Sequence, residues 1–142
     1  MSKERLYIFD TTLRDGAQTQ GVHFSIDEKT KIAHALDKLG VDYIEGGWPG
    51  ANPSDTEFFQ KGLDLKNSTF TAFGMTKKAG RSAENDPGLS AILNSNTNAV
   101  CVVGKSWDFH VDVALGISNE ENLENIKETT TVSYTHLTLP TN

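Results

Sequence analysis

Apolar residues along the chain fall into two kinds of block. Short apolar runs typical of buried strands occur at 6–9, 41–45, 69–73 and 99–103. Between them, apolar residues recur at helical spacing, as at Ile26, Ile32, Ala33, Leu36 and Leu39. The chain therefore alternates strand and helix four times.

Local signals mark where the helices begin and end. Ser25 and Glu28 have the spacing of a capping box, and Gly40 is a suitable stop for the first helix. Asn52 precedes Pro53, which favours the start of a second helix. Further helical segments are expected around 89–93, around 109–115 and from Ser118 onward.

The strand–helix alternation predicts an α/β fold with a parallel sheet. Two architectures remain open: an open doubly wound sheet, and the N-terminal half of a (β/α)8 barrel with about four strand–helix units. The loop after the first strand lacks a GxGxxG sequence, which argues against a dinucleotide-binding open sheet.

Composition narrows the functional classes. The chain has 142 residues, 37% hydrophobic and 23% charged, as expected for one globular core. Its net charge of −6 argues against general nucleic-acid binding, and no apolar run approaches the roughly 20 residues of a membrane span. A single cysteine, Cys101, fits a reducing cytoplasm.

The last 14 residues differ in character from the rest. Six of them are Thr, and the run 132–141 resembles the translation of a sequencing adapter. We expect residues 1–128 to form the barrel segment and residues 129–142 to be a disordered, non-native tail. β-Branched residues and Pro140 are expected to interrupt the helix that starts at Ser118. The alternative is a genuine Thr-rich terminal strand.

The main chemical signal is the run from Asp10 to Gln18, which includes Leu13-Arg14-Asp15-Gly16 and is followed by Lys29. It lies just beyond the first strand, at the end of a barrel where catalytic residues collect. A carboxylate there can bind a divalent cation, and an adjacent arginine suits a carboxylate or an oxyanion. The alternative is a salt bridge between Arg14 and an acid within the loop.

Three separated blocks in this order resemble the isopropylmalate, homocitrate and citramalate synthase family. They are the Arg14-Asp15 motif with Lys29, the block Tyr43 to Gly50, and the block Gly104 to His110. The last two are more similar to the citramalate synthase subgroup than to isopropylmalate synthases. The resemblance covers about residues 5 to 128.

The resemblance implies roles for three residues of the motif. Asp15 matches the family's metal-binding carboxylate, and Arg14 matches the catalytic arginine that contacts the keto acid. Gln18 is expected beside them in the substrate pocket, whereas we interpret Asp10 as a residue that stabilises the loop.

Three further substrate-binding candidates each have a structural alternative. Glu45 ends the second strand and either reaches the barrel mouth or pairs with Arg14 or a backbone amide. Thr76 follows the third strand and either touches substrate or caps a helix. His110 either approaches the mouth of the site or packs on the surface.

The family condenses acetyl-CoA with a 2-keto acid, using a divalent metal ion (Mg, Mn or Zn). The implied substrate is pyruvate, the implied product citramalate, and the implied parent a cytoplasmic homodimer. The family's remaining metal ligands, a His pair and an Asn, follow later strands, and no His-x-His occurs here. We therefore expect this chain alone to be inactive and, with two unpaired sheet edges, to aggregate.

Alternative functions remain open. One is 2-isopropylmalate synthesis, and another is a lyase of the hydroxymethylglutaryl-CoA type. A third is a non-catalytic half-barrel that binds a metal or ligand as it stands.

Overall fold

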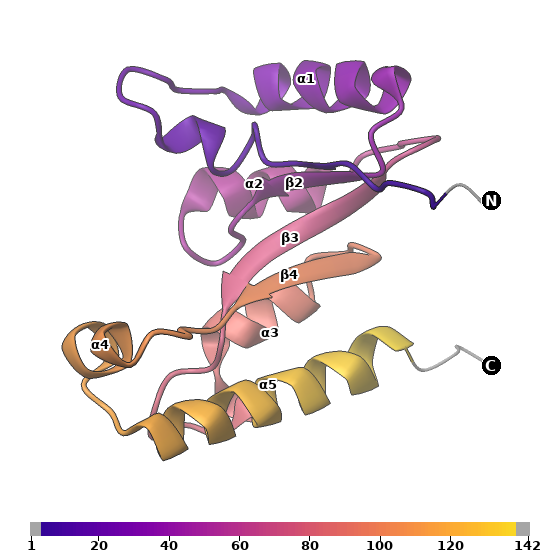
Figure 1. The fold of residues 1–142 in the computed structure, drawn as a ribbon. Helices are drawn as coiled ribbons and strands as arrows, with labels where there is room; N and C mark the ends of the chain where they lie inside the picture. Colours follow the sequence, from indigo (N-terminus) through magenta and orange to yellow (C-terminus); the bar gives the residue numbers. More distant parts are fainter. Residues whose placement is uncertain (1–3, 139–142) are drawn as a thin grey trace.

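The computed structural model describes residues 4–138 and contains one parallel sheet of four strands. The strands are β1 (Phe9–Asp10), β2 (Tyr43–Gly47), β3 (Thr69–Met75) and β4 (Ala99–Val103). They lie side by side in the order in which they occur along the chain (Figure 1). A doubly wound sheet reverses its order at a switch point, whereas a barrel does not. The fold is therefore the N-terminal half of a (β/α)8 barrel, as one of the two expectations had it.

The helices follow the strands as the sequence predicts. They are α1 (Ile26–Leu39), α2 (Pro53–Lys61), α3 (Pro87–Leu93), α4 (Asp108–His110) and α5 (Asn119–Thr138), with short turns η1 (Gly16–Gln18), η2 (Ala83–Asn85) and η3 (Val111–Leu115). Both halves of the Ser25–Glu28 capping box form, and Gly40 ends α1 with a φ of 87°. Asn52 accepts a hydrogen bond from the backbone of Asp55 at the start of α2.

Strand β1 differs from the expected buried strand at 6–9. It has two residues, Phe9 and Asp10, and pairs only with β2 among the described residues. The preceding Leu6, Tyr7 and Ile8 are 86%, 62% and 57% exposed. Their apolar side chains have no second layer to pack against on this edge of the sheet.

The core lies between the sheet and the helices. One buried cluster joins the first two units through Leu13, Ala33, Val41, Ile44 and Phe58. A second, centred on Phe59, Ala72 and Ile92, joins α2, β3 and α3. Phe70 packs against both clusters, so the two cores are continuous.

Helix α5 continues beyond the point where the sequence predicted a break. Residues 129–138 are helical, so the predicted interruption of the helix is not observed, while residues 139–142 lie outside the described residues. Tertiary contact holds this part of the helix, because Thr129 is 1% exposed and accepts a hydrogen bond from the N–H of Lys77 at 2.9 Å. The helix also accommodates the threonine hydroxyls, each of which donates to the carbonyl four residues earlier. These bonds run from Thr129, Thr130, Thr131 and Thr135 and measure 2.7–2.9 Å.

Two aspartates secure the amino-terminal end of the sheet. The carboxylate of Asp37, on α1, accepts hydrogen bonds from the backbone N–H groups of Lys66, Asn67 and Ser68, just before β3. Asp42, just before β2, accepts from the N–H of Ile8 at 2.8 Å and from Arg5. Each carboxylate thus joins a strand start to a segment about 30 residues away in the sequence.

Candidate active site

The loop after β1 is folded by its own backbone and by Asp10. The N–H groups of Arg14 and Gly16 both donate to the carbonyl of Thr11, at 3.1 and 3.0 Å. The carboxylate of Asp10 accepts from the backbone and hydroxyl of Thr12. Asp10 therefore stabilises the loop, as predicted, and does not take part in the charged group around Arg14.

Arg14 is the centre of that group. Its Nε donates to Glu45 Oε2 at 2.7 Å, and its Nη1 lies 3.2 Å from Asp15 Oδ1. Its guanidinium also stacks on the ring of Phe73, with 4.0 Å to the ring centroid. Nη2 makes no hydrogen bond to any described residue. The arginine is thus held on three sides with one nitrogen left to donate.

Glu45 is the buried partner of this group. Its side chain is 1% exposed, and its second oxygen, Oε1, has no hydrogen-bond partner among the described residues. Burial, then the negative charge of Glu45 and a hydrogen-bonding contact with its carboxylate, raise the pKa of the Cys101 thiol on β4. The pairing alternative for Glu45 is confirmed, and the Cys101 thiol is the donor group that lies near its carboxylate.

Asp15 and Gln18 are more open to solvent. The Asp15 side chain is 62% exposed and uses one oxygen for Arg14. Gln18 lies in η1 beside a cavity of about 290 Å³ that Arg14, Lys29 and Trp48 also line. No group of three or more His, Cys, Asp or Glu side chains among residues 4–138 is arranged to hold a metal ion. Asp15 has an oxygen to offer a cation, but these residues alone do not complete a metal site.

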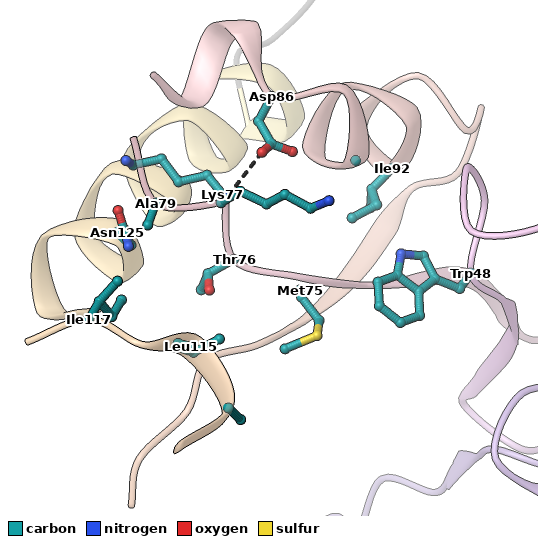
Figure 2. A pocket seen from close by; sticks show the side chains of 13 residues that line it. Trp48, Met75, Thr76, Lys77, Ala79, Asp86, Ile92, Leu115, Ile117 and Asn125 are labelled. Atoms are coloured by element: carbon teal, nitrogen blue, oxygen red, sulfur yellow. Dashed lines mark hydrogen bonds between the residues drawn. The ribbon is translucent and has the colours of Figure 1, made fainter. Parts of the chain in front are cut away.

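Thr76 lies at a larger cavity of about 410 Å³ beyond the carboxyl end of β3, which α3, η3 and α5 also line. Figure 2 shows Asn125 and Ile117 on one side of this cavity and Trp48 on the other. Its lining is mainly apolar, from Met75, Ile92, Leu115 and their neighbours. Thr76 is not a helix cap, because no described helix begins beside it. Its N–H donates to the carbonyl of Val103 on β4 at 3.2 Å, which continues the sheet.

Two cavity residues had no assigned role from the sequence. Asn125 is 4% exposed and lines the cavity. Lys77 is buried, and its ammonium bonds the carbonyl of Arg81 at 2.7 Å and lies 3.3 Å from the carboxylate of Glu128. The sequence did carry one signal that this face of α5 is buried. Its polar residues recur at helical spacing, at Asn122, Asn125 and Thr129.

His110 is not brought to Arg14. It is exposed in α4 and packs with Trp107 and Phe109, with ring centroids 4.6 and 6.2 Å away. His110 therefore packs on the surface, which was the structural alternative for this residue. The other candidates around the first two strands do lie together: Arg14, Asp15, Gln18 and Glu45.

Comparison with known proteins places this geometry in a family. The family model described as HMGL-like matches residues 5–136. The chain belongs to the HMGL-like family. The chain spans about a quarter to a third of the length of the curated relatives described below.

Two curated relatives and one solved structure illustrate the relationship. The HMGL-like chain is 49% identical to the (R)-citramalate synthase of Aquifex aeolicus over 128 residues, 89% of this chain and 24% of that protein. It is 37% identical to 2-isopropylmalate synthase 1 of Caldanaerobacter subterraneus over 129 residues, 90% of this chain and 32% of that protein.

The solved structure is hydroxymethylglutaryl-CoA lyase from Pseudomonas aeruginosa. It superposes with a TM-score of 0.70 at 20% identity, covering 94% of this chain and 43% of that chain. At this identity the likeness supports the fold alone. Within the part of the HMGL-like chain that the structure describes, no helix is both long and apolar enough to cross a membrane.

Proposed function

We propose that this chain is the N-terminal part of a citramalate synthase, which condenses acetyl-CoA with pyruvate. The observation that carries the proposal is the charged group around Arg14. Sequence identity favours citramalate as the product, because the chain is 49% identical to one (R)-citramalate synthase but 37% identical to one 2-isopropylmalate synthase over nearly equal lengths. In this proposal the acceptor is a small 2-keto acid, and the chain supplies one side of its pocket.

Arg14 would carry the charge stabilisation in this reaction. Attack on a ketone carbonyl places negative charge on its oxygen, and a fixed donor aimed at that oxygen lowers the barrier. The unused Nη2 of Arg14 is such a donor, because Glu45, Asp15 and Phe73 already fix the rest of the guanidinium. Gln18 would bind the acceptor beside it, while Glu45 acts on the substrate through Arg14.

The proposed enzyme would need a divalent cation, to which Asp15 would contribute one oxygen ligand. Its exposure and its second oxygen support this role. A catalytic metal requires several protein ligands, and the described residues supply no cluster of three. The remaining ligands would therefore come from protein outside this chain.

The larger cavity would accept the acyl-thioester arm of acetyl-CoA. Its mainly apolar walls suit a flexible chain, and the amide of Asn125 on one wall suits the amide groups of that chain. Thr76 lies on the same wall and would contact the acyl group. His110 lies outside this wall, in α4. It would contact the substrate if α4 turned toward the cavity in the whole enzyme.

Three expectations about the whole protein belong to the same proposal. The parent would be a cytoplasmic homodimer, and residues 129–142 would be foreign to it. Reading the source DNA through the codons after Glu128 tests the last point. A frame that continues into strand–helix units containing His-x-His supports it, and a native stop after Asn142 contradicts it.

A chimera tests the function. Residues 1–128 of this chain replace the matching segment of the Aquifex aeolicus enzyme, and thiol release from acetyl-CoA is measured with pyruvate and with 2-ketoisovalerate. We expect turnover with pyruvate in preference to 2-ketoisovalerate and a loss of roughly 10²- to 10³-fold in Arg14→Met. A folded chimera that prefers 2-ketoisovalerate would support isopropylmalate synthesis instead.

The isolated chain serves as the negative control in this assay. We expect no pyruvate-dependent thiol release from it, because most of the metal ligands are missing. Citramalate formed by the isolated chain would show that a half-barrel is sufficient.

A further inference from the structure

A second buried ion pair lies next to the Arg14 group and has no role in the proposed chemistry. Lys29 Nζ, on α1, lies 2.6 Å from Asp55 Oδ1, on α2, and the two side chains are 5% and 13% exposed. Lys29 also donates to the carbonyl of Gly46 at 3.0 Å. The pair therefore contacts the end of β2 directly.

Asp55 holds the following residues of that segment. Its Oδ2 accepts from the backbone N–H of Trp48 at 2.9 Å and from the side chain of Asn52 at 3.0 Å. Gly47 makes this approach possible, because a Cβ there would lie 2.6 Å from the Asp55 carboxyl carbon at a φ of 150°. The carbonyl of Gly46 and the N–H of Trp48 are thus fixed by one ion pair.

Residues at both ends of the stretch from Glu45 to Trp48 contact Arg14 or the Phe73 ring beneath it. Glu45, immediately before Gly46, accepts the hydrogen bond from Arg14 Nε. The Trp48 ring meets the Phe73 ring edge-on, with centroids 5.3 Å apart, and Phe73 in turn lies under the Arg14 guanidinium. Two contact routes therefore lead from the ion pair to Arg14.

We propose that the Lys29–Asp55 ion pair is a positioning device for Arg14. By fixing the segment from Gly46 to Trp48, it keeps Glu45 and Phe73 in the places that hold the guanidinium in one orientation. The inference rests on the proposed function only in treating Arg14 as the cation that meets the substrate.

The competing explanation is a simple link between α1 and α2. Apolar side chains often replace a buried ion pair without loss of stability, so linking the helices does not by itself require these charges. The chain offers a matched control, since Lys61 and Asp27 also join α2 to α1, at 3.1 Å, but are 50% and 80% exposed.

The Nε–H signal of Arg14 in nuclear magnetic resonance reports the proposed effect without any substrate. The chain has three arginines, Arg5, Arg14 and Arg81, so Arg5→Lys and Arg81→Lys assign the signal. We compare Lys29→Met/Asp55→Leu with Lys61→Met/Asp27→Leu in the full chain. In the first variant the Arg14 Nε–H should exchange with water at least about tenfold faster, and in the second it should not change.

Two results would overturn the proposal. One is an unchanged Arg14 signal in a Lys29→Met/Asp55→Leu protein whose backbone spectrum shows it to be folded. If that variant does not fold, Asp55→Asn removes the charge of the pair with little change in shape, and an unchanged Arg14 signal there has the same meaning.

The chimera separates this inference from the proposed function. Faster Arg14 exchange in a chain whose chimera does not use pyruvate supports positioning while rejecting the reaction. A chimera in which Lys29→Met/Asp55→Leu lowers kcat more than tenfold with little change in the KM for pyruvate supports both.

Discussion

The two ends of the sheet use carboxylates differently. At the amino-terminal end, Asp37 and Asp42 each have both oxygens bonded, to backbone N–H groups and to Arg5. At the carboxyl-terminal end, Glu45 keeps one buried oxygen without a partner, and Asp15 is 62% exposed. Asp10 and Asp55 show that fully bonded carboxylates also occur at the carboxyl-terminal end. The carboxyl-terminal end differs because, alongside these, Glu45 and Asp15 retain free acceptor oxygens.

The difference shows how a barrel separates stability from chemistry. A carboxylate fully satisfied by backbone donors stabilises the folded chain and has nothing left to offer a ligand. A carboxylate with an open lone pair is a cost to folding that a substrate, proton donor or cation can offset. Active sites of barrels lie at the carboxyl ends of the strands, which agrees with this distribution.

The largest effect should come from removing the cation at the carboxyl-terminal end. Arg14→Met leaves the Glu45 carboxylate buried without a charged partner, which should lower the free energy of unfolding by about 3 to 5 kcal/mol. Urea denaturation followed by circular dichroism measures the change. Arg14→Met/Glu45→Gln is the control and should recover most of the loss; if it does not, the pairing with Glu45 is not the cause.

The next effect should come from the amino-terminal end. Asp37→Ala removes the acceptor for the N–H groups of Lys66, Asn67 and Ser68 and should lower the free energy of unfolding by about 2 to 3 kcal/mol. In the chimera, the same substitution should leave kcat for pyruvate unchanged at temperatures where the protein is folded. A selective loss of kcat would contradict the division between the two ends.

Acid should reduce the Asp37 contribution. Burial opposes ionisation, but the N–H groups of Asn67, Lys66 and Ser68 outweigh it, so the pKa of Asp37 lies below its usual value. A lowered folded-state pKa gives stability that is present above the unfolded-state pKa, near 4, and is lost as the pH falls through the folded value. The stability gap between the native chain and Asp37→Ala should therefore be constant from pH 5 to 7 and narrow below about pH 4. A gap that widens in acid would reverse the assigned sign.

The smallest effect should come from the exposed pair between the helices. Lys61→Met removes a salt bridge whose side chains are 50% and 80% exposed, and should change the free energy of unfolding by less than about 0.5 kcal/mol. Thermal denaturation at low and high salt checks this. A loss comparable to that of Asp37→Ala would show that exposure is not what separates these interactions.

Local interactions let the sequence by itself determine much of the fold. The capping box of Ser25 and Glu28, the stop at Gly40 and the start at Pro53 act over three or four residues, so they are readable without a structure. The strand–helix alternation is equally local. The motif also identified Arg14 and Asp15, because adjacent residues share a loop wherever the rest of the chain lies.

Only the tertiary structure decided the long-range features. The order of the strands selected the barrel, and packing brought Arg14 to Glu45, 31 residues away, and to Phe73. The exposure of β1 and the continuation of α5 through Thr129 also departed from sequence expectation. These features depend on which surfaces pack together. A helix or strand can form its backbone hydrogen bonds in more than one tertiary arrangement, so the pattern of residue types alone does not specify the packing.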